Sequence, residues 1–135
     1  MTPDDAIKAD EEIYRAVKRS FPSCIDEINH KVKSALFKDN NGVSVDRQGN
    51  RTRAESQQAM RAYFQQRLKA IAMLYGKDIK QANVKPFSAP TTGNLFHVEL
   101  FADANKGPIT QLQALQLADA AELIEWHDDV DWIVS

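Results

Sequence analysis

The order of apolar and polar residues along the chain predicts both helices and strands. Apolar residues recur at helical spacing over three stretches: residues 2–19, a segment that begins at residue 53, and residues 109–124. The first helix is expected to end before Pro22, because proline disfavours helical geometry in the residue that precedes it. The second begins with a capping-box sequence, from Thr52 to Glu55. Its end is open, because residues 68–75 keep the helical period and are equally typical of a buried strand.

Alternating apolar and polar residues predict strands in the other parts of the chain. Residues 43–47 alternate strictly, and residues 32–37 alternate in part. Between them, Asp39-Asn40-Asn41-Gly42 favours a turn, because Asn and Gly tolerate positive φ. We therefore expect residues 32–37 and 43–47 to pair as a β-hairpin. Residues 95–102 are rich in strand-forming residue types. Two shorter elements are expected, a helix over residues 77–82 and a strand over residues 84–87.

These elements place the chain in the α+β class, and its length of 135 residues is typical of one domain. We expect a single domain over residues 1–135, with a small antiparallel or mixed sheet of three to five strands packed by two or three helices. Cys24 is the only cysteine, so no internal disulfide or cysteine-based zinc site is expected. No stretch resembles a secretory signal, and no apolar run approaches the ~18 residues of a membrane span. We therefore expect a cytoplasmic protein that does not contact membranes.

Charge is distributed unevenly along the chain, although the formal net charge is only −2. Residues 31–85 contain 12 Lys or Arg and 4 Asp or Glu. Residues 107–135 contain no Lys or Arg and 6 acids, and their last part, residues 125–135, is an acidic segment with two Trp. Such asymmetry is typical of a nucleic-acid face or an interaction tail. The simpler interpretation is that the two regions attract each other within one compact molecule.

The order of these features resembles a family of small uncharacterised bacterial proteins with a SAAFK…SVDR signature and a later Asn-x-x-His strand. The matching pieces are Arg19 with Pro22, then Ser34-Ala35-Leu36-Phe37-Lys38, then Ser44-Val45-Asp46-Arg47, and then Asn94-Leu95-Phe96-His97. The resemblance covers residues from about Glu12 to Ile124. No activity is established for the family, so the resemblance implies a fold and not a function. It favours a strand at residues 68–75 that follows a helix of about residues 53–66.

Two departures from the family pattern limit what the resemblance implies. The family has His before its Pro, where this chain has Phe21. The family also has Pro and a small residue inside the Asn…His motif, where this chain has Leu95 and Phe96. No role of the earlier His is therefore transferred to this chain.

The strongest candidate for chemistry is a polar group at the edge of the predicted sheet. An Asp that orients a His, with a Ser nearby, is the arrangement of an activated nucleophile or general base. The catalytic candidates are Asp46, His97 and Ser44, and the binding candidates beside them are Ser34, Lys38, Arg47 and Asn94. These residues converge only if the hairpin and the 95–102 strand share one sheet. The structural alternative is that Asp46 and Arg47 make turn and cap bonds, and that His97 is an ordinary sheet residue.

Other candidate sites have less support in the sequence. His30, His97 and His127 are far apart, and the acids after His127 lack the Gly and terminal Glu of a calcium loop, so we expect no metal and no cofactor. Basic residues in or beside the helix that begins at residue 53 are candidates for phosphate contacts, namely Arg47, Arg51, Arg53, Arg61, Arg67 and Lys69. Trp126 and Trp132 in the acidic segment either dock onto a partner or fold back onto the basic region.

Two hypotheses of function from different classes remain open. The first is a small interaction or accessory module that binds a protein partner or a second copy through its acidic C-terminal segment, with a place in a bacterial defence or toxin-linked operon. The second is a small hydrolase or transferase that uses Asp46 and His97. Nucleic-acid binding through the basic helix is a further alternative, and the pI near 5.9 disfavours it.

Overall fold

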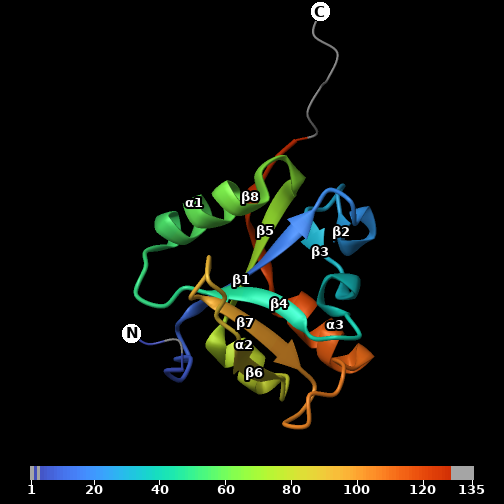
Figure 1. Ribbon diagram of the computed structural model, residues 1–135. Coiled ribbons are helices and arrows are strands. Elements are labelled where there is room, and N and C mark those ends of the chain that lie inside the picture. The colour runs from blue at the N-terminus through green and yellow to red at the C-terminus, as the bar shows by residue number, and fades with distance from the viewer. Residues whose placement is uncertain (1, 3, 129–135) are drawn as a thin grey trace, which may run out of the picture.

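The computed structural model of the chain describes Thr2 and residues 4–128, and it has an α+β fold (Figure 1). One antiparallel sheet has six strands in the order β6-β7-β4-β1-β5-β8. The strands are β1 (Glu12–Lys18), β4 (Val43–Arg47), β5 (Leu68–Tyr75), β6 (Lys85–Ser88), β7 (His97–Phe101) and β8 (Glu122–Trp126). The predicted class is confirmed, but the prediction of three to five strands was wrong, because two segments predicted as helix form β1 and β8.

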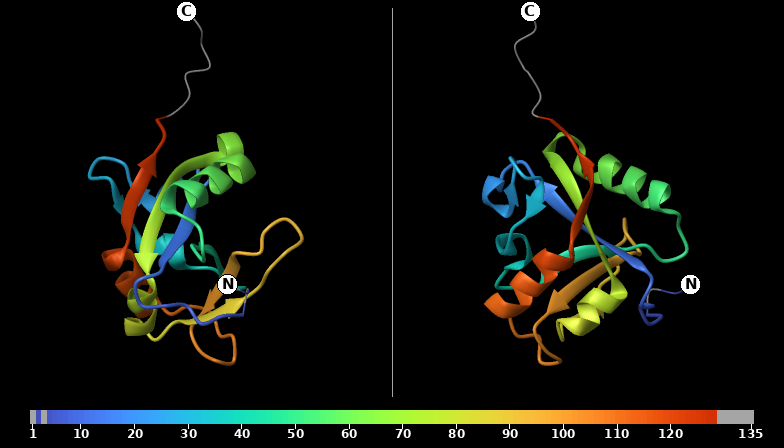
Figure 2. Two further views of the ribbon diagram at one scale, coloured as in Figure 1. Left: turned by 90° about the vertical axis from the view of Figure 1, so that its left-hand side faces the viewer. Right: turned by 180° about the vertical axis from the view of Figure 1, so that it is seen from behind.

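The remaining elements cover the two faces of this sheet. Helix α1 (Arg53–Phe64) lies on one face, and α2 (Gly76–Gln81) and α3 (Gln111–Ala120) lie on the other (Figure 2). The smaller elements are the β2–β3 hairpin (Ile25–Asp26 and Lys31–Val32) and the 3₁₀ helices η1 (Pro22–Cys24), η2 (Ser34–Phe37) and η3 (Gln65–Arg67). Within residues 4–128, none of the helices combines the length and apolarity that a bilayer span requires.

The expected N-terminal helix was wrong, because its second half is the central strand β1. Ile13 and Val17 face the larger core under α2 and α3, whereas Tyr14 and Ala16 face Met60 of α1. A strand covered on both faces places apolar residues at neighbouring positions, which imitates the helical pattern. The Thr2 side chain donates to Asp5, so it closes a local turn.

The expected β-hairpin was half right. Residues 43–47 do form a strand, and Gly42 before it has a φ of +91°, in agreement with the predicted turn. Residues 34–37, however, form η2, and β4 pairs with β1 and β7 instead. Leu36 and Phe37 are buried in the core that also contains Leu117 of α3. Burial of these two side chains under α3 outweighs a short strand pairing.

The other predicted elements agree more closely with the structure. The capping box of α1 has both expected hydrogen bonds, and residues 68–75 are the strand β5. The elements α2, β6 and β7 lie within a few residues of their predicted positions. The helix predicted over residues 109–124 was too long, since α3 ends at Ala120 and the next residues pair with β5 as β8.

A buried ion pair ties the N-terminal segment to the sheet. Arg47 is 3% exposed and Glu11 is 8% exposed, and their side chains form two hydrogen bonds of 2.8 Å. Arg47 also donates to the carbonyl of Asp5, and the N–H of Gly49 donates to Glu11. Burial disfavours ionised Glu11, but hydrogen bonds from Arg47 and Gly49 outweigh it and lower the pKa of its carboxyl. The pair therefore holds residues 5–11 against the end of β4.

We predict that Glu11→Gln lowers the free energy of unfolding by about 3–5 kcal/mol, because it removes one charge from a buried pair. Arg53→Gln is the matched control, since Arg53 makes a more exposed pair with Glu12 and its loss should cost less than about 1 kcal/mol. Urea denaturation at neutral pH measures both. Equal costs for the two variants would contradict the anchoring role of the buried pair.

Candidate functional site

A cleft of about 620 Å³ lies on the α1 side of the sheet, between α1 and the loop that joins β6 to β7. Figure 2 shows this loop projecting on the same side as α1. Two strands contribute to the cleft lining, β1 with Tyr14, Ala16 and Lys18 and β4 with Ser44 and Asp46. The region around α1 contributes Arg51, Met60, Tyr63, Phe64 and Arg67, and the β6–β7 loop contributes residues 91–97. Its volume lies in the range typical of small-ligand sites.

The three predicted catalytic residues all lie in this cleft. Asp46 of β4 is directly opposite His97 of β7, and Ser44 is opposite Glu99. Residues directly opposite each other in an antiparallel pair have Cβ atoms about 4.5–5.5 Å apart and side chains on the same face. His97 Nε2 is also 3.9 Å from Glu99 Oε1. The sheet therefore holds a carboxyl, an imidazole and a hydroxyl in one row across two strands.

Asp46 is the most perturbed carboxyl in the cleft. Burial raises its pKa, and this effect exceeds the opposing effects of a hydrogen bond from Asn94 and of the charges on Arg51 and His97. Asn94 Nδ2 donates to Asp46 Oδ1 at 2.9 Å, and the N–H of Phe96 donates to Asn94 Oδ1. Asn94 is thus held by its own loop and positions the carboxyl. A buried carboxyl of this kind retains a proton at a higher pH than an exposed Asp does.

Arg51 is a cleft residue that the sequence analysis did not assign to the site. Its guanidinium carbon is 3.7 Å from the centroid of the Phe96 ring, and Nη2 donates to the carbonyl of Arg47 at 2.8 Å. Arg51 precedes α1 and Phe96 follows the β6–β7 loop, so the contact joins two segments 45 residues apart. No local sequence signal predicts a pairing at that separation.

The α1 side of the cleft has a second set of cation–aromatic contacts. Tyr63 and Phe64 pack edge to face, with ring centroids 4.8 Å apart. The guanidinium of Arg67 lies 5.5 Å from the Phe64 centroid, and the ammonium of Lys18 lies 5.8 Å from it. Tyr63 is 69% exposed. Aromatic rings and cations therefore face the opening from both sides.

Three predicted binding residues lie elsewhere, which corrects the expectation that all of them converge. Lys38 donates to Gln111 of α3, and Gln111 donates to Ser34, so both residues lie beside α3 on the opposite face of the sheet. Arg47 is adjacent to Asp46 in β4, and successive side chains of a strand point to opposite faces. It is therefore buried with Glu11, whereas Asn94 is the binding candidate that does reach the cleft.

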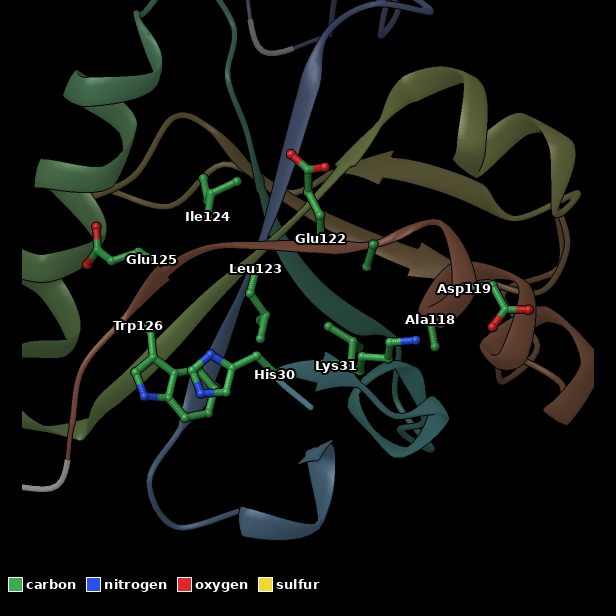
Figure 3. Close-up of a pocket in the computed structure, with 11 residues that line it drawn as sticks. His30, Lys31, Ala118, Asp119, Glu122, Leu123, Ile124, Glu125 and Trp126 are labelled. Carbon is green, nitrogen blue, oxygen red and sulfur yellow. The ribbon is translucent and has the colours of Figure 1, made fainter. Parts of the chain in front are cut away.

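Trp126 packs against its own chain, as the fold-back interpretation expects. Figure 3 shows its indole ring over the imidazole of His30, and the ring centroids are 4.1 Å apart with planes 13° from parallel. The ammonium of Lys69 lies 4.9 Å from the Trp126 ring. A groove of about 570 Å³ runs beside these rings along β8 (Figure 3). Trp132 lies outside the described residues.

The basic residues in and around α1 do not form one continuous cationic surface. Arg47, Arg53 and Arg61 pair with Glu11, Glu12 and Glu125, respectively, and Lys69 is buried beside Trp126. These internal contacts use most of the charges that the nucleic-acid interpretation requires. One of these pairs, Arg61 with Glu125, joins the basic region to the acidic region, as the simpler interpretation expects.

Metal and thiol chemistry receive no support from the residues that the structure describes. Among them, no three His, Cys, Asp or Glu side chains come together as a metal site. Cys24 is half-buried, and burial raises the pKa of its thiol, which disfavours the reactive thiolate. Burial likewise raises the pKa of Tyr14 to about 12, so its hydroxyl stays protonated under the cleft.

We predict that Asp46→Asn makes the chain more stable at neutral pH. Folding raises the pKa of Asp46 above its usual value of 3.8, so ionised Asp46 costs stability at pH values above the folded pKa. The advantage of the variant should shrink as the pH falls towards 3.8, where both the folded and the unfolded wild-type chain carry the proton. Thermal unfolding followed by circular dichroism across this range measures the effect. The exposed acid Asp119 provides a control, and an Asp46→Asn advantage that does not depend on pH would contradict the prediction.

Comparisons with known proteins do not identify the chain. No protein-family model matches it, and no curated protein or solved structure does. A functional assignment therefore has to come from the geometry and chemistry of the cleft.

Proposed function

We propose that the chain is a small acid–base enzyme, a hydrolase or transferase, whose active site is the cleft around Asp46. The observation that carries the proposal is the half-buried Asp46 carboxyl, with its raised pKa, directly across the sheet from His97. A titratable group perturbed by burial inside a cleft is a typical mark of a functional site. The two motifs Ser44-Val45-Asp46-Arg47 and Asn94-Leu95-Phe96-His97, which carry the family resemblance, also meet here, and that convergence supports the assignment.

The proposed roles follow from where each group lies. Asp46 donates a proton to the leaving atom of the substrate, and His97 accepts a proton from the attacking water or alcohol. One proton is given and one is taken, so the reaction balances as a hydrolysis or a transfer. Asn94 keeps the Asp46 carboxyl in position through its hydrogen bond. Ser44 is exposed and makes no hydrogen bond to a base among the described residues, which favours a substrate contact over a nucleophile.

We predict that Asp46→Asn and His97→Gln each lower the rate of a hydrolysis that the chain catalyses by about 10²–10⁴-fold, because each removes a proton-transfer group. A panel of p-nitrophenyl esters, phosphates and glycosides provides the substrates, and release of p-nitrophenol measures turnover. Asp119→Asn, on the far side of the sheet, is the matched control and should keep the wild-type rate. Hydrolysis that survives Asp46→Asn unchanged would remove Asp46 from the mechanism.

A second candidate function is protein binding through the C-terminal segment, as an accessory module. The observation that favours it is that β8 is an edge strand of the sheet, paired only with β5 among the described strands. The opposite edge strand β6 contains Lys85 and Pro86, two residue types that block strand addition, whereas Glu122–Trp126 contains neither Lys nor Pro. An edge without such protection suits pairing with another strand, either of a partner protein or of a second copy.

The version with a second copy makes a prediction that needs only this chain. If two β8 edges pair, the β8 amides that face away from β5 should gain protection from hydrogen exchange as the protein concentration rises. Exchange measured by NMR over a concentration series tests this, with the amides of β6 as the internal control. Protection of β8 that does not change with concentration would exclude the homodimer.

A further inference from the structure

Four cations line the cleft, namely Arg15, Lys18, Arg51 and Arg67, and none of them forms a salt bridge among the residues that the structure describes. Arg15 donates to the carbonyls of Leu36 and Ser44. Lys18 contacts the Phe64 ring, and Arg67 donates to the carbonyls of Tyr63 and Phe64. Arg51 donates to the carbonyls of Gln48 and Arg47. Backbone carbonyls satisfy N–H groups but do not neutralise a positive charge.

Other arginines close to α1 do pair with carboxylates. Three other arginines around α1 are each in a salt bridge, with N–O distances of 2.5–2.8 Å: Arg47, Arg53 and Arg61. The chain also has more acids than Lys and Arg, 19 against 17, so a shortage of carboxylates does not explain the difference. The cleft brings four cations together, and Asp46 is the one carboxyl among the residues that line it.

Three of these cations lie against aromatic rings that border the opening. Phe96 and Arg51 form one side, and Tyr63, Phe64 and Arg67 form the other. Exposed aromatic rings and planar guanidinium groups stack on flat heterocycles, and Arg and Lys bind phosphate. The cleft therefore offers a stacking surface and an anion-binding surface side by side.

We propose that the cleft binds a nucleotide, that is, a flat heteroaromatic ring that carries a phosphate. The proposal rests on the proposed function in that it names the ligand class of the same site. The ring lies between the Phe96 and Tyr63 sides, and the phosphate is bound by Arg67 and Lys18. Ser44 also lines this space, and its hydroxyl is available to the sugar or the ring edge. A mononucleotide and the phosphorylated end of a nucleic-acid strand share this chemistry.

Titration of the ¹⁵N-labelled chain with adenosine monophosphate, followed by NMR, tests the proposal. We expect amide shifts that cluster at the cleft, and at least about tenfold weaker binding of adenosine and of inorganic phosphate, since each lacks one half of the ligand. Arg67→Gln should weaken binding of the monophosphate about tenfold. Arg61→Gln is the matched control, because Arg61 lies on α1 but pairs with Glu125 of β8, outside the cleft.

A 5′-phosphorylated oligoadenylate distinguishes the two sources of the ligand. Equal affinity for the oligonucleotide and the monophosphate indicates a free nucleotide, and tighter, strongly salt-dependent binding of the oligonucleotide indicates a nucleic-acid end. The proposal is overturned if neither compound shifts the cleft amides, or if Arg67→Gln and Arg61→Gln weaken binding equally.

The experiments can refute the proposed acid–base reaction and the proposed ligand class independently of each other. Asp46→Asn should keep nucleotide binding while it lowers the rate of hydrolysis by about 10²–10⁴-fold. Nucleotide binding without any hydrolysis that depends on Asp46 would refute the reaction and keep the ligand. Asp46-dependent hydrolysis in a chain that binds no nucleotide would refute the ligand and keep the reaction.

Discussion

The register between β4 and β7 is the constraint on which the cleft depends. It places Asp46 opposite His97 and Ser44 opposite Glu99, and it puts Val43, Val45, Val98 and Leu100 on the other face, in the core. A slip of one residue would move the whole apolar set to solvent and the polar row into the core. Burial of these four side chains therefore fixes the geometry of the polar row.

Electrostatic pairing divides the charges of the molecule into two groups. The basic and acidic regions do attract each other, since Arg61 of α1 and Glu125 of β8 meet although they lie far apart in the sequence. Arg47 also pairs with Glu11 in the interior, although Glu11 lies outside the acidic region. The cations that line the cleft form no salt bridge among the described residues, so the positive field there is opposed by a single lining carboxyl, that of Asp46. A low-dielectric site with such a field binds anions more strongly than an exposed basic surface does.

Several predictions from the sequence held because the signals are local. The capping box of α1, the turn before β4 and the apolar run of β5 each depend on residues close together in the chain. The sequence could place Asp46, His97 and Ser44 together because strand alternation puts them on one face once their strands pair. The predictions that failed concern β1, η2 and β8, where the outcome depends on what covers each face. An apolar run does not reveal whether it is buried on one side or two.

The sequence by itself determined the α+β class, the positions of most strands and helices, and the residue types that line the proposed site. Only the tertiary structure decided that β4 pairs with β1 and β7, that Arg47, Ser34 and Lys38 lie away from the cleft, and that Arg51 lies in it. The physical reason is that these outcomes depend on contacts between distant segments. Such contacts form only where burial and charge pairing across the whole molecule outweigh the local preferences of each segment.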